Sequence, residues 1–441
     1  MKFPLRTALG LLAALPLPLA RAADGGGGLA REAATLGKPA WRPMLAYLAA
    51  LHQRATHPAA PPFAYPWEDL GPGYGYGPAF GHWDLVHEMI DELPAWPEHV
   101  REQLLNDLGL QLPDGFLPGS VYMPGSPAAP GGPPAARNGP SFDRGAQGHP
   151  PLWVVAAGDY LKLHPDPALE ADCLRHLILQ IGWFEAHRRA QPGGFFYNDI
   201  LLHKWESGVD DGVRFDGAAP GPRACVDATS HVYQLYAYAA QWSRELGADD
   251  RPWRERAAAL ADFLRTRLWD ASSGFFYDSW AAADPARRTG AFEGIWPVVV
   301  GAARPDQAAR VIDGWMLNPR RLFTPHPIAT VARDDPKFSL RMWRGPAWNS
   351  MTYWAARGCV RYGRTDAARR LLEAALDDTA AQFRRTGTIW EYYHPEGGRP
   401  EDLARKPYTR RNRPWTDYLG HNPLFAMARL WEACGGSAGG E

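Results

Sequence analysis

The chain has 441 residues, 46% of them hydrophobic and 22% charged, so it can bury a substantial core in one large domain or in two to three average ones. This composition excludes an intrinsically disordered protein, and a formal net charge of −1 without a basic tract argues against nucleic acid as a partner. The 19 tryptophans fit a carbohydrate-binding protein, because sugar C–H faces pack on rings, and equally a helical core filled with aromatics.

The first residues have the order of a signal peptide. Lys2 and Arg6 form a positive end, residues 8–20 form a short apolar run, and small residues stand at Ala20 and Ala22. The run is too short and too rich in proline for a transmembrane helix, and no cysteine follows it that would carry a lipid anchor. We expect cleavage after Ala22 and a periplasmic or secreted product with no membrane anchor.

The rest of the chain reads as a succession of helical patterns separated by breakers such as Gly363 and Pro305, and convincing strand patterns are scarce. The spacing predicts twelve helices, at 29–54, 80–93, 96–110, 150–164, 167–190, 226–246, 251–270, 290–303, 304–316, 346–363, 364–386 and 415–434.

The predicted helices are of two kinds. Those at 251–270 and 364–386 carry apolar residues on one stripe and charged residues elsewhere, whereas 226–240 and 346–360 are small, apolar or aromatic nearly all round. Helices of the second kind are buried on most sides. Alternation of the two kinds indicates an all-α fold, an (α/α)6 barrel of twelve helices in six hairpins.

The unusual loops all precede helices expected to be inner ones. They are GHWD at 81–84, QGHPP at 147–151, ESGVDD at 206–211, MWRGPAWN at 342–349, and WEYYHP through PWTDYLGHN at 390–422. If the inner helices run parallel, all of these loops open at the same end of the barrel. We therefore expect one mouth, around a pocket lined by tryptophan and carboxylate.

We expect a linker and first outer helix at 23–64, a barrel at 65–435 closed by the 29–54 helix, and a disordered tail at 436–441. One connection, 124–146, is long and rich in proline and glycine, so it is either a floppy surface loop or a lid beside the mouth.

No motif predicts a cofactor or a metal ion. A phosphate-binding glycine loop, a GxSxG elbow and an HExxH pair are absent from the sequence. The loop histidines stand on separate segments, at His82, His149, His203, His394 and His421. The cysteines show no metal-ligand spacing, and we expect buried free thiols rather than the disulfides that export would permit. They are Cys173, Cys225, Cys359 and Cys434.

Two segments place carboxylates among aromatics and glycines on loops, WESGVDDGVRF at 205–215 and WEYYHP at 390–395. Two carboxyl groups from distant loops are the usual equipment for cleaving a glycosidic bond, one as acid toward the leaving oxygen and one as base toward water.

The same segments resemble glycoside hydrolase family 63, and more distantly the family 37 trehalases. ESGVDDGVRF is similar to the motif that carries the acid of family 63, MWRGPAWNSMTYWAARG to the segment before an inner helix, and WEYYHPEGGRP to the segment that carries the base. The similarity runs from about residue 65 to 432 and is greatest to the compact mannosylglycerate-hydrolase-like group. It implies an (α/α)6 fold and exo-acting, inverting hydrolysis of an α-linked sugar.

The resemblance implies that Asp210 is the general acid and Glu391 the general base, with carboxyl groups about 6.5–9.5 Å apart to admit a water. Repulsion from Glu206 and Asp211 could keep the acid protonated, and Glu396 is a rival carboxylate that we expect in a solvent-exposed turn. We expect the substrate-binding residues to be Trp83, Asp84, Gln147, Gly208, Trp343, Arg344, Trp348 and Trp415.

Several alternatives stay open. Arg344 and Arg214 could hold the catalytic loops through carboxylates instead of binding substrate, or serve an acidic aglycone such as glycerate. The partner is a small carbohydrate, either a glucoside or a mannoside, and the oligomeric state is not predicted. A sugar epimerase or polysaccharide lyase on the same barrel, and a non-catalytic sugar-binding protein, remain the competing functions.

Overall fold

The computed structural model describes residues 25–124, 126, 135–136, 148–202, 205–407 and 411–437. The expected signal peptide, most of the 124–146 connection and Gln147 lie outside the described residues. Within them, none of the helices combines the length and the apolar character needed to cross a bilayer.

Helices dominate the described part of the chain. In order they are α1 (Gly25–Ala33), α2 (Arg42–Ala55), α3 (His82–Glu92), α4 (Pro97–Gly109), α5 (Trp153–Leu163), α6 (Pro167–His187), α7 (Asp199–Leu202), α8 (Val226–Glu245), α9 (Arg251–Arg267), α10 (Ser279–Ala283), α11 (Trp296–Val299), α12 (Pro305–Val311), α13 (Asn349–Arg361), α14 (Thr365–Thr386) and α15 (Leu424–Ala433).

The other elements are short. The strands are β1 (Thr56–His57), β2 (Trp67–Glu68), β3 (Ala79–Gly81), β4 (Ser120–Tyr122), β5 (Ala135–Ala136), β6 (Trp269–Asp270) and β7 (Phe275–Phe276). Single helical turns of the 3₁₀ type are η2 (Val213–Phe215), η3 (Pro285–Arg287), η4 (Phe292–Ile295) and η6 (Pro400–Asp402), and η5 (Ile312–Met316) is a π-turn that continues α12.

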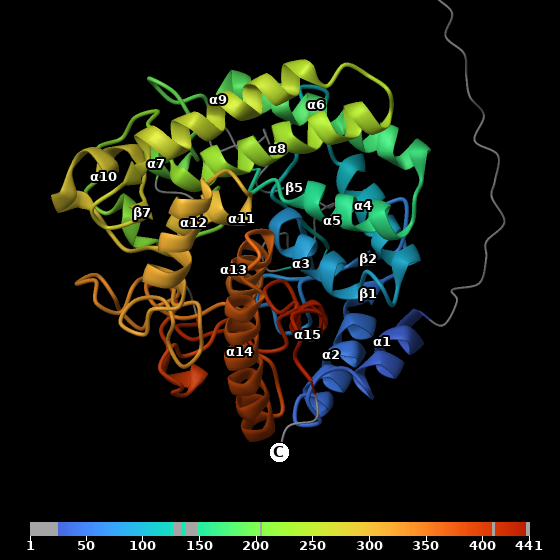
Figure 1. Cartoon of the computed structure of the whole chain (residues 1–441). Coiled ribbons are helices and arrows are strands. Elements are labelled where there is room, and N and C mark those ends of the chain that lie inside the picture. Colours follow the sequence, from blue (N-terminus) through green and yellow to red (C-terminus); the bar gives the residue numbers. More distant parts are fainter. Residues whose placement is uncertain are drawn as a thin grey trace, which may run out of the picture.

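A closed ring of helices forms the centre of the molecule (Figure 1). Helices α3, α5, α8, α11, α13 and α15 each contact the next, and α15 returns to contact α3. Helices α4, α9 and α14 pack on the ring helix that precedes them, α6 contacts both α5 and α8, and α2 contacts α14 and α15. This arrangement confirms the predicted (α/α)6 barrel.

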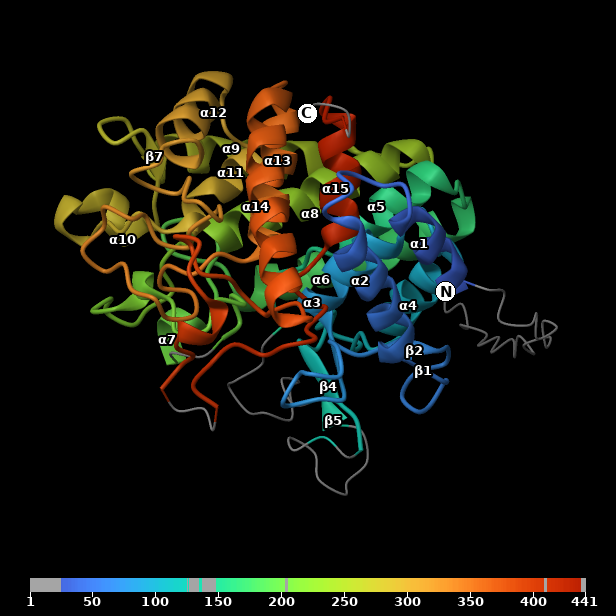
Figure 2. The same ribbon diagram turned by 90° about the horizontal axis from the view of Figure 1, so that it is seen from below.

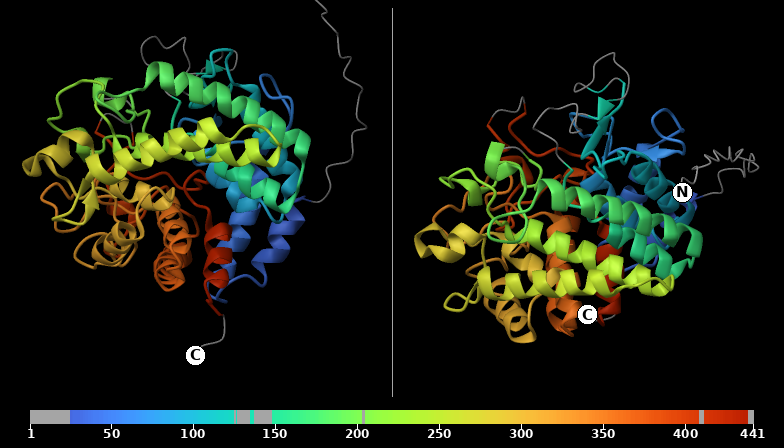
Figure 3. Two further views of the ribbon diagram at one scale, coloured as in Figure 1. Left: turned by 45° about the horizontal axis from the view of Figure 1, so that its top comes forward. Right: turned by 90° about the horizontal axis from the view of Figure 1, so that it is seen from above.

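The two kinds of helix in the sequence take the two positions in the ring. The first half of α8 is buried on nearly all sides, as expected of an inner helix. Helix α14 buries a single stripe that includes Leu371, Leu372 and Leu376, and α9 buries Leu260 and Leu264. Helices α6, α8 and α9 lie side by side along one wall (Figure 3). Burial of each apolar stripe, about 25 cal/mol per Å², drives this packing.

Three predicted helices are shorter in the structure. The 29–54 pattern is two helices, because Gly37 adopts a left-handed φ of 63° and Pro43 starts α2. In 290–303, the N–H of Phe292 donates to the carbonyl of Thr330 (3.0 Å), so a loop contact replaces the first helical turns.

The last helix, expected at 415–434, begins only at Leu424. Its first part pairs instead with the base segment, since Glu391 N–H donates to Trp415 O at 2.8 Å and Asp417 N–H donates to Ile389 O at 2.9 Å. A contact between segments distant in sequence therefore overrides the local helical pattern.

Strands β3 and β4 pair antiparallel, with Phe80 opposite Val121, directly before α3 begins. They lie with the long connections at one end of the barrel, and the C-terminal end of α15 lies at the other (Figure 2). All four cysteines are free thiols, and three of them are buried, as expected.

Candidate active site

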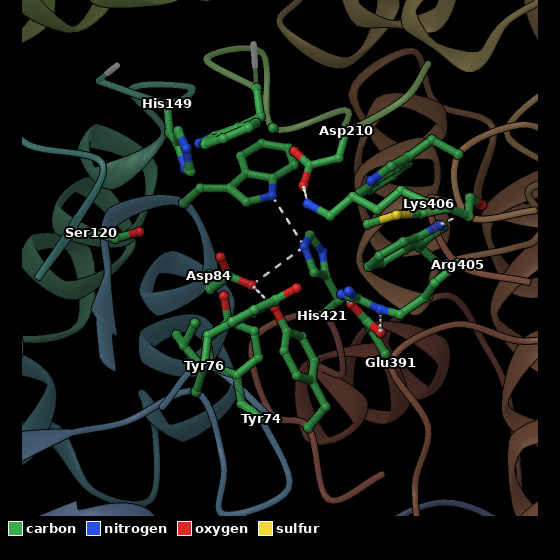
Figure 4. A pocket seen from close by; sticks show the side chains of 18 of the residues that line it. Tyr74, Tyr76, Asp84, Ser120, His149, Asp210, Glu391, Arg405, Lys406 and His421 are labelled. Atoms are coloured by element: carbon green, nitrogen blue, oxygen red, sulfur yellow. Dashed lines mark hydrogen bonds and ion pairs between the residues drawn. The ribbon is translucent and has the colours of Figure 1, made fainter. Parts of the chain in front are cut away.

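A cavity of about 280 Å³ lies where the loops lead into the inner helices (Figure 4). Its volume is near the lower end of the roughly 300–1,000 Å³ of small-molecule sites, so it suits a ligand of one or two sugar-sized units. It is lined by Leu70, Tyr74, Tyr76, Trp83, Asp84, Ser120, Tyr122, His149, Trp205, Gly208, Asp210, Met342, Trp343, Trp348, Glu391, Arg405, Lys406, Tyr418 and His421.

The predicted acid and base both line this cavity. Asp210 comes from the ESGVDD loop before α8, and Glu391 comes from the WEYYHP segment after α14. The loops that the sequence analysis expected at one mouth therefore do meet in one pocket. The roles of the two carboxylates stay predictions.

Glu391 is held firmly. Arg405 Nε donates to its Oε2 at 2.9 Å, and the Nη2 of the same guanidinium pairs with Oε1. The backbone N–H of Trp415 also donates to Oε2 at 3.0 Å, and the side chain is only 2% exposed. A two-pronged guanidinium contact fixes both the charge and the direction of a carboxylate.

Asp210 is held by a single cation. Its Oδ2 forms an ion pair with Lys406 Nζ, and its side chain is 19% exposed. Figure 4 shows this pair on one side of the pocket and the Arg405–Glu391 pair on another. Lys406 Nζ also lies 5.4 Å from the ring centroid of Trp205.

The two carboxylates near Asp210 in the sequence, Glu206 and Asp211, are paired with arginines. Arg188 binds Glu206 through Nε–Oε2 (2.8 Å) and Nη2–Oε1 (2.7 Å) contacts, and the N–H of Asn198 also donates to this carboxylate. Arginines take up the charge of Asp211 as well. The expectation that these two carboxylates keep Asp210 protonated by repulsion is therefore corrected, because each already has a guanidinium partner.

Arg344 is not among the residues that line the cavity. Its Nε donates to the carbonyl of Asp211 at 2.8 Å, and its Nη1 contacts Asp216 at 2.7 Å. Arg341 Nε lies 2.8 Å from Asp211 Oδ2. Arg344 thus anchors the backbone of the acid loop, the alternative role, and its assignment as a substrate-binding residue is corrected. Arg214 is buried in a separate cluster behind this loop.

Three of the predicted tryptophans line the cavity. Trp343 and Trp348 stack face to face, with centroids 3.8 Å apart and an interplanar angle of 4°. Trp83 lies against Gly208, which has a left-handed φ of 73°, and a Cβ at that glycine would stand 3.1 Å from the indole. Gly208 is therefore required both by its backbone conformation and by the ring beside it.

Trp415 does not line the cavity. It acts from behind, through the N–H bond to Glu391 and through its ring, whose centroid is 5.1 Å from the Arg405 guanidinium carbon. Its predicted stacking on sugar is corrected to support of the base. Gln147 lies outside the described residues.

Asp84 is the third carboxylate of the cavity. Tyr418 Oη donates to its Oδ1 at 2.5 Å, and His421 Nε2 lies 3.4 Å away. Burial raises the pKa of Asp84 to about 7, and the charges of Glu391 and Asp210 add to the effect. Asp84 is thus poised to change protonation near neutral pH.

His421 is neutral, since burial lowers its pKa well below the usual range. Trp83 Nε1 donates to its Nε2 at 3.1 Å, so the proton stands on Nδ1, which is 2.7 Å from Ser350 Oγ. The imidazole therefore connects the floor of the pocket to α13 without carrying charge.

Sequence reasoning missed four functional candidates, Arg405, Lys406, Tyr418 and His421. The signal for the first two was the five cations within RKPYTRRNRPW at 405–415, after the base segment, a short group that the near-zero net charge of the whole chain conceals. A run of cations next to a catalytic carboxylate points to carboxylate pairing or to an anionic ligand.

The site can perform general acid–base chemistry. It combines a fixed carboxylate, a second carboxylate with a lysine partner, and walls that contain aromatic side chains. Among the described residues, no histidine or cysteine set in this cavity has the arrangement of a metal centre.

Comparison with known proteins agrees with this chemistry. The family model of the mannosylglycerate hydrolase MGH1-like glycoside hydrolase domain matches residues 78–409. A mannosylglycerate hydrolase from Rubrobacter radiotolerans is 26% identical over 163 residues, and the matched stretch spans only 36% of that relative and 36% of this chain.

Solved structures show the same fold. The family 63 mannosylglycerate hydrolase of Thermus thermophilus in complex with glucose has a TM-score of 0.64 at 19% identity, over 89% of this chain and 100% of that one. Its complex with Tris and D-glycerate has a TM-score of 0.62 at 20% identity, over 86% and 98%.

The neutral trehalase of Saccharomyces cerevisiae, at 16% identity, has a TM-score of 0.60 over 86% of this chain and 78% of that one. These matches confirm the predicted fold, and the family match confirms the predicted family and the glycoside hydrolase class. The chain belongs to the MGH1-like mannosylglycerate hydrolase family of glycoside hydrolases.

Proposed function

We propose that this protein is an inverting exo-α-glycosidase that hydrolyses a small α-linked glucoside or mannoside with a carboxylate on its aglycone. The observation that carries the proposal is the presence of Glu391 and Asp210, which are 181 residues apart in the chain, in one small aromatic pocket. Two carboxylates on opposite sides of a glycosidic bond are sufficient for the reaction.

Glu391 acts as the base. Its carboxylate takes a proton from the water that attacks the anomeric carbon, while the C–O bond to the aglycone breaks on the opposite face. Hydrogen bonds from Arg405 and from the Trp415 N–H hold its carboxylate in a fixed direction before substrate arrives. Attack from that face converts an α-glycoside into a β-sugar.

Asp210 acts as the acid and donates a proton to the leaving oxygen. To do so it must present an O–H to the leaving oxygen, and its Oδ2 is occupied by the ion pair with Lys406. The Lys406 contact must therefore be exchanged when substrate binds.

An anionic aglycone offers that exchange. A glycerate-type carboxylate in the pocket would compete with Asp210 for Lys406 and leave Asp210 free to hold a proton. Arg405 is a second cation among the residues that line the pocket, and its buried Nη1 has no hydrogen-bond partner among the described residues. The Thermus thermophilus relative has been solved with glucose and with D-glycerate, which supports such a substrate.

We also propose that the protein is exported, on the charged, apolar and small-residue order of its first 22 residues. Mass spectrometry of protein from the periplasm should find a chain that begins at Ala23. A chain that retains Met1–Ala22 contradicts export by this route.

The decisive experiment is a substrate panel with the purified protein. It should contain mannosylglycerate, glucosylglycerate, the glycerol analogues that lack the carboxylate, and trehalose, with released hexose as the signal and NMR of the first product. We expect hydrolysis, preference for the glycerate compounds and initial β-anomer.

Other outcomes would decide between the alternatives. An initial α-anomer means retention and overturns the roles given to the two carboxylates. An unsaturated product indicates a lyase, an isomerised but uncleaved sugar indicates an epimerase, and binding without turnover on the whole panel indicates a sugar-binding protein.

A further inference from the structure

A second group of titratable side chains lies in the core, at the end of α3 opposite to the turn that carries Asp84 of the cavity. His52 of α2, Glu68 of β2, Glu92 of α3 and His99 of α4 come from four different elements. Their side chains are at most 1% exposed. We call these four residues the His–Glu cluster.

The polar atoms of the cluster face one another. His52 Nδ1 lies 2.7 Å from Glu68 Oε1 and 3.4 Å from Glu92 Oε1. His99 Nε2 lies 3.7 Å from Glu68 Oε2 and 4.0 Å from Glu92 Oε2. Only the shortest of these is a hydrogen bond, and the other three are too long.

The inward atoms accordingly lack partners. Both carboxylate oxygens of Glu92, Oε2 of Glu68 and Nε2 of His99 are buried without a hydrogen bond among the described residues. Leaving such groups unpaired costs about 1–3 kcal/mol each, more when they are charged. Several in one place indicate that something is bound between them.

A second group of buried acids in this chain is paired with an arginine. Asp227, Asp278 and Glu293 also converge in the core, and the guanidinium of Arg214 stands between them, with contacts of 2.9 Å to Asp278 and 3.1 Å to Glu293. There a side chain supplies the cation. Among the described residues, no arginine or lysine pairs with Glu68 or Glu92 of the His–Glu cluster.

The outward nitrogen of His52 also has the surroundings of a metal ligand, since His52 Nε2 lies 3.2 Å from Asp91 Oδ2. The outward nitrogen of His99, Nδ1, lies 3.3 Å from the side-chain nitrogen of Gln103 and 3.9 Å from Glu102 Oε2. A ligating histidine usually turns its second nitrogen to a carboxylate, which fixes the ring and its tautomer. Trp96 stacks on His99 at 4.1 Å and limits its rotation further.

We propose that His52, Glu68, Glu92 and His99 bind one divalent transition-metal ion, with zinc as the best fit. Imidazole nitrogens and carboxylate oxygens are ligands that zinc accepts, and four of them complete a tetrahedral site. One ligand atom each of His52, Glu68 and Glu92 lies within 4.8 Å of the other two. His99 Nε2 lies 3.7 Å from Glu68 Oε2 and 4.0 Å from Glu92 Oε2, so it becomes the fourth ligand by moving toward them.

The ion would be structural and not catalytic. Its four ligands leave no open position, and burial removes it from solvent. It joins α2, which precedes the first ring helix, to β2, α3 and α4. On α3, Asp84, Glu88 and Glu92 follow one another at intervals of four residues, so the site would also stiffen the helix whose first turn carries Asp84.

Metal analysis of the full chain tests the proposal directly. Protein purified without a nickel column and without added metal should contain about one zinc ion per chain, as measured by inductively coupled plasma mass spectrometry. Cobalt(II) incorporated during refolding in place of zinc should show the strong visible absorption of a tetrahedral ion. Neither readout depends on glycosidase activity.

Matched variants sharpen the test. Glu92→Gln and His99→Gln keep the side-chain shape closely and should remove the metal and lower the thermal midpoint. Glu293→Gln removes an equally buried carboxyl group from the Arg214 cluster and should keep the full metal content.

Wild-type protein that is unfolded in chelator and refolded with and without zinc provides a second test, because a variant could fail to fold. The zinc-refolded sample should melt higher, by mass action of an ion that binds only the folded state. The opposing outcome is a cluster held together by shared protons alone. In that case neither sample contains metal, the two midpoints coincide, and Glu92→Gln melts no lower than the wild type.

Discussion

The two carboxylates of the pocket stand in opposite surroundings. Glu391 has a two-pronged arginine, a backbone N–H and almost no exposure, whereas Asp210 has one lysine partner and is 19% exposed. The acid loop is itself anchored on either side of Asp210, by Arg188 at Glu206 and by Arg344 at Asp211. The difference is therefore one between the partners of the two side chains.

This contrast matches the work that an inverting mechanism assigns to each group. A base must be charged and aligned with its water in every turnover, so fixed partners help it. An acid must gain a proton, lose it and regain it, so a partner on a flexible four-carbon stem that can be exchanged is useful. The surroundings alone thus support Glu391 as base and Asp210 as acid.

Removing the fixed carboxylate should have the largest effect. Glu391→Ala should lower kcat at least by the roughly 10²–10⁴-fold of general base catalysis. Activated glycosyl fluorides should show the same loss, because water activation is still missing. The buried Arg405 loses its partner, which should also cost roughly 3–5 kcal/mol of stability.

The control for this variant is Glu396→Ala, five residues along the same segment. Glu396 is 38% exposed and pairs with Arg333 outside the pocket, so its loss should leave kcat unchanged. Steady-state kinetics and thermal melts of both variants provide the comparison. Loss of activity in Glu396→Ala with activity retained in Glu391→Ala would reassign the base.

Replacing Asp210 should lower activity less than replacing Glu391, at least on activated substrates. Asp210→Asn should slow glycosides with poor leaving groups by roughly 10²–10⁴-fold and be partly relieved with glycosyl fluorides, which need little protonation. Asp211→Asn, next in the chain but bound to Arg341 and Arg344, should affect both kinds of substrate equally. Equal losses on fluorides and glycosides for Asp210→Asn contradict its role as acid.

Replacing Lys406, the partner of Asp210, should have an intermediate effect on activity. Lys406→Met should lower kcat/KM for a glycerate glycoside by roughly 10–100-fold, since hydrogen bonds to charged groups are worth about 1.5–3 kcal/mol. The glycerol analogue should change far less, and Lys406→Arg should restore part of the loss. An equal loss on both substrates means that Lys406 serves Asp210 alone and does not bind the aglycone.

The sequence predicted the barrel well because its evidence is local. Apolar stripes such as Leu371, Leu372 and Leu376 on α14 and the nearly all-apolar first half of α8 decide which helices face inward. The failures were non-local. Helix α15 starts late because residues 415–417 pair with the base segment, a contact that no period within 415–434 contains.

For the site, too, local features could be predicted from the sequence and contacts between distant segments could not. Motifs placed Asp210, Glu391 and the tryptophan loops, but ion pairs depend on which side chains meet in space. Lys406 is 196 residues from Asp210, and Arg344 reaches across 133 residues to Asp211. Such partners cannot be assigned from spacing, and neither can the four-element His–Glu cluster, whose ligands follow no metal motif.

The smallest expected effect is that of replacing Asp84, whose carboxyl group interacts with the charges of both Glu391 and Asp210. Burial, with Glu391 and Asp210 nearby, raises its pKa from 3.8 to about 7. A carboxyl group whose folded pKa is raised stabilises the fold fully below about pH 4 and loses that contribution as pH rises through about 7. Asp84→Asn mimics the protonated form at every pH, and its amide oxygen can still accept a hydrogen bond from the Tyr418 hydroxyl.

The thermal midpoint of the Asp84→Asn variant relative to wild type should therefore rise between pH 5 and pH 8. The rise should be several degrees at most if each pKa unit is worth about 1.4 kcal/mol. Thermal melts across this range, with the exposed-site change Glu396→Gln as the baseline for replacing a carboxylate by an amide, measure the difference. A gap that stays constant with pH means that Asp84 does not carry the raised pKa.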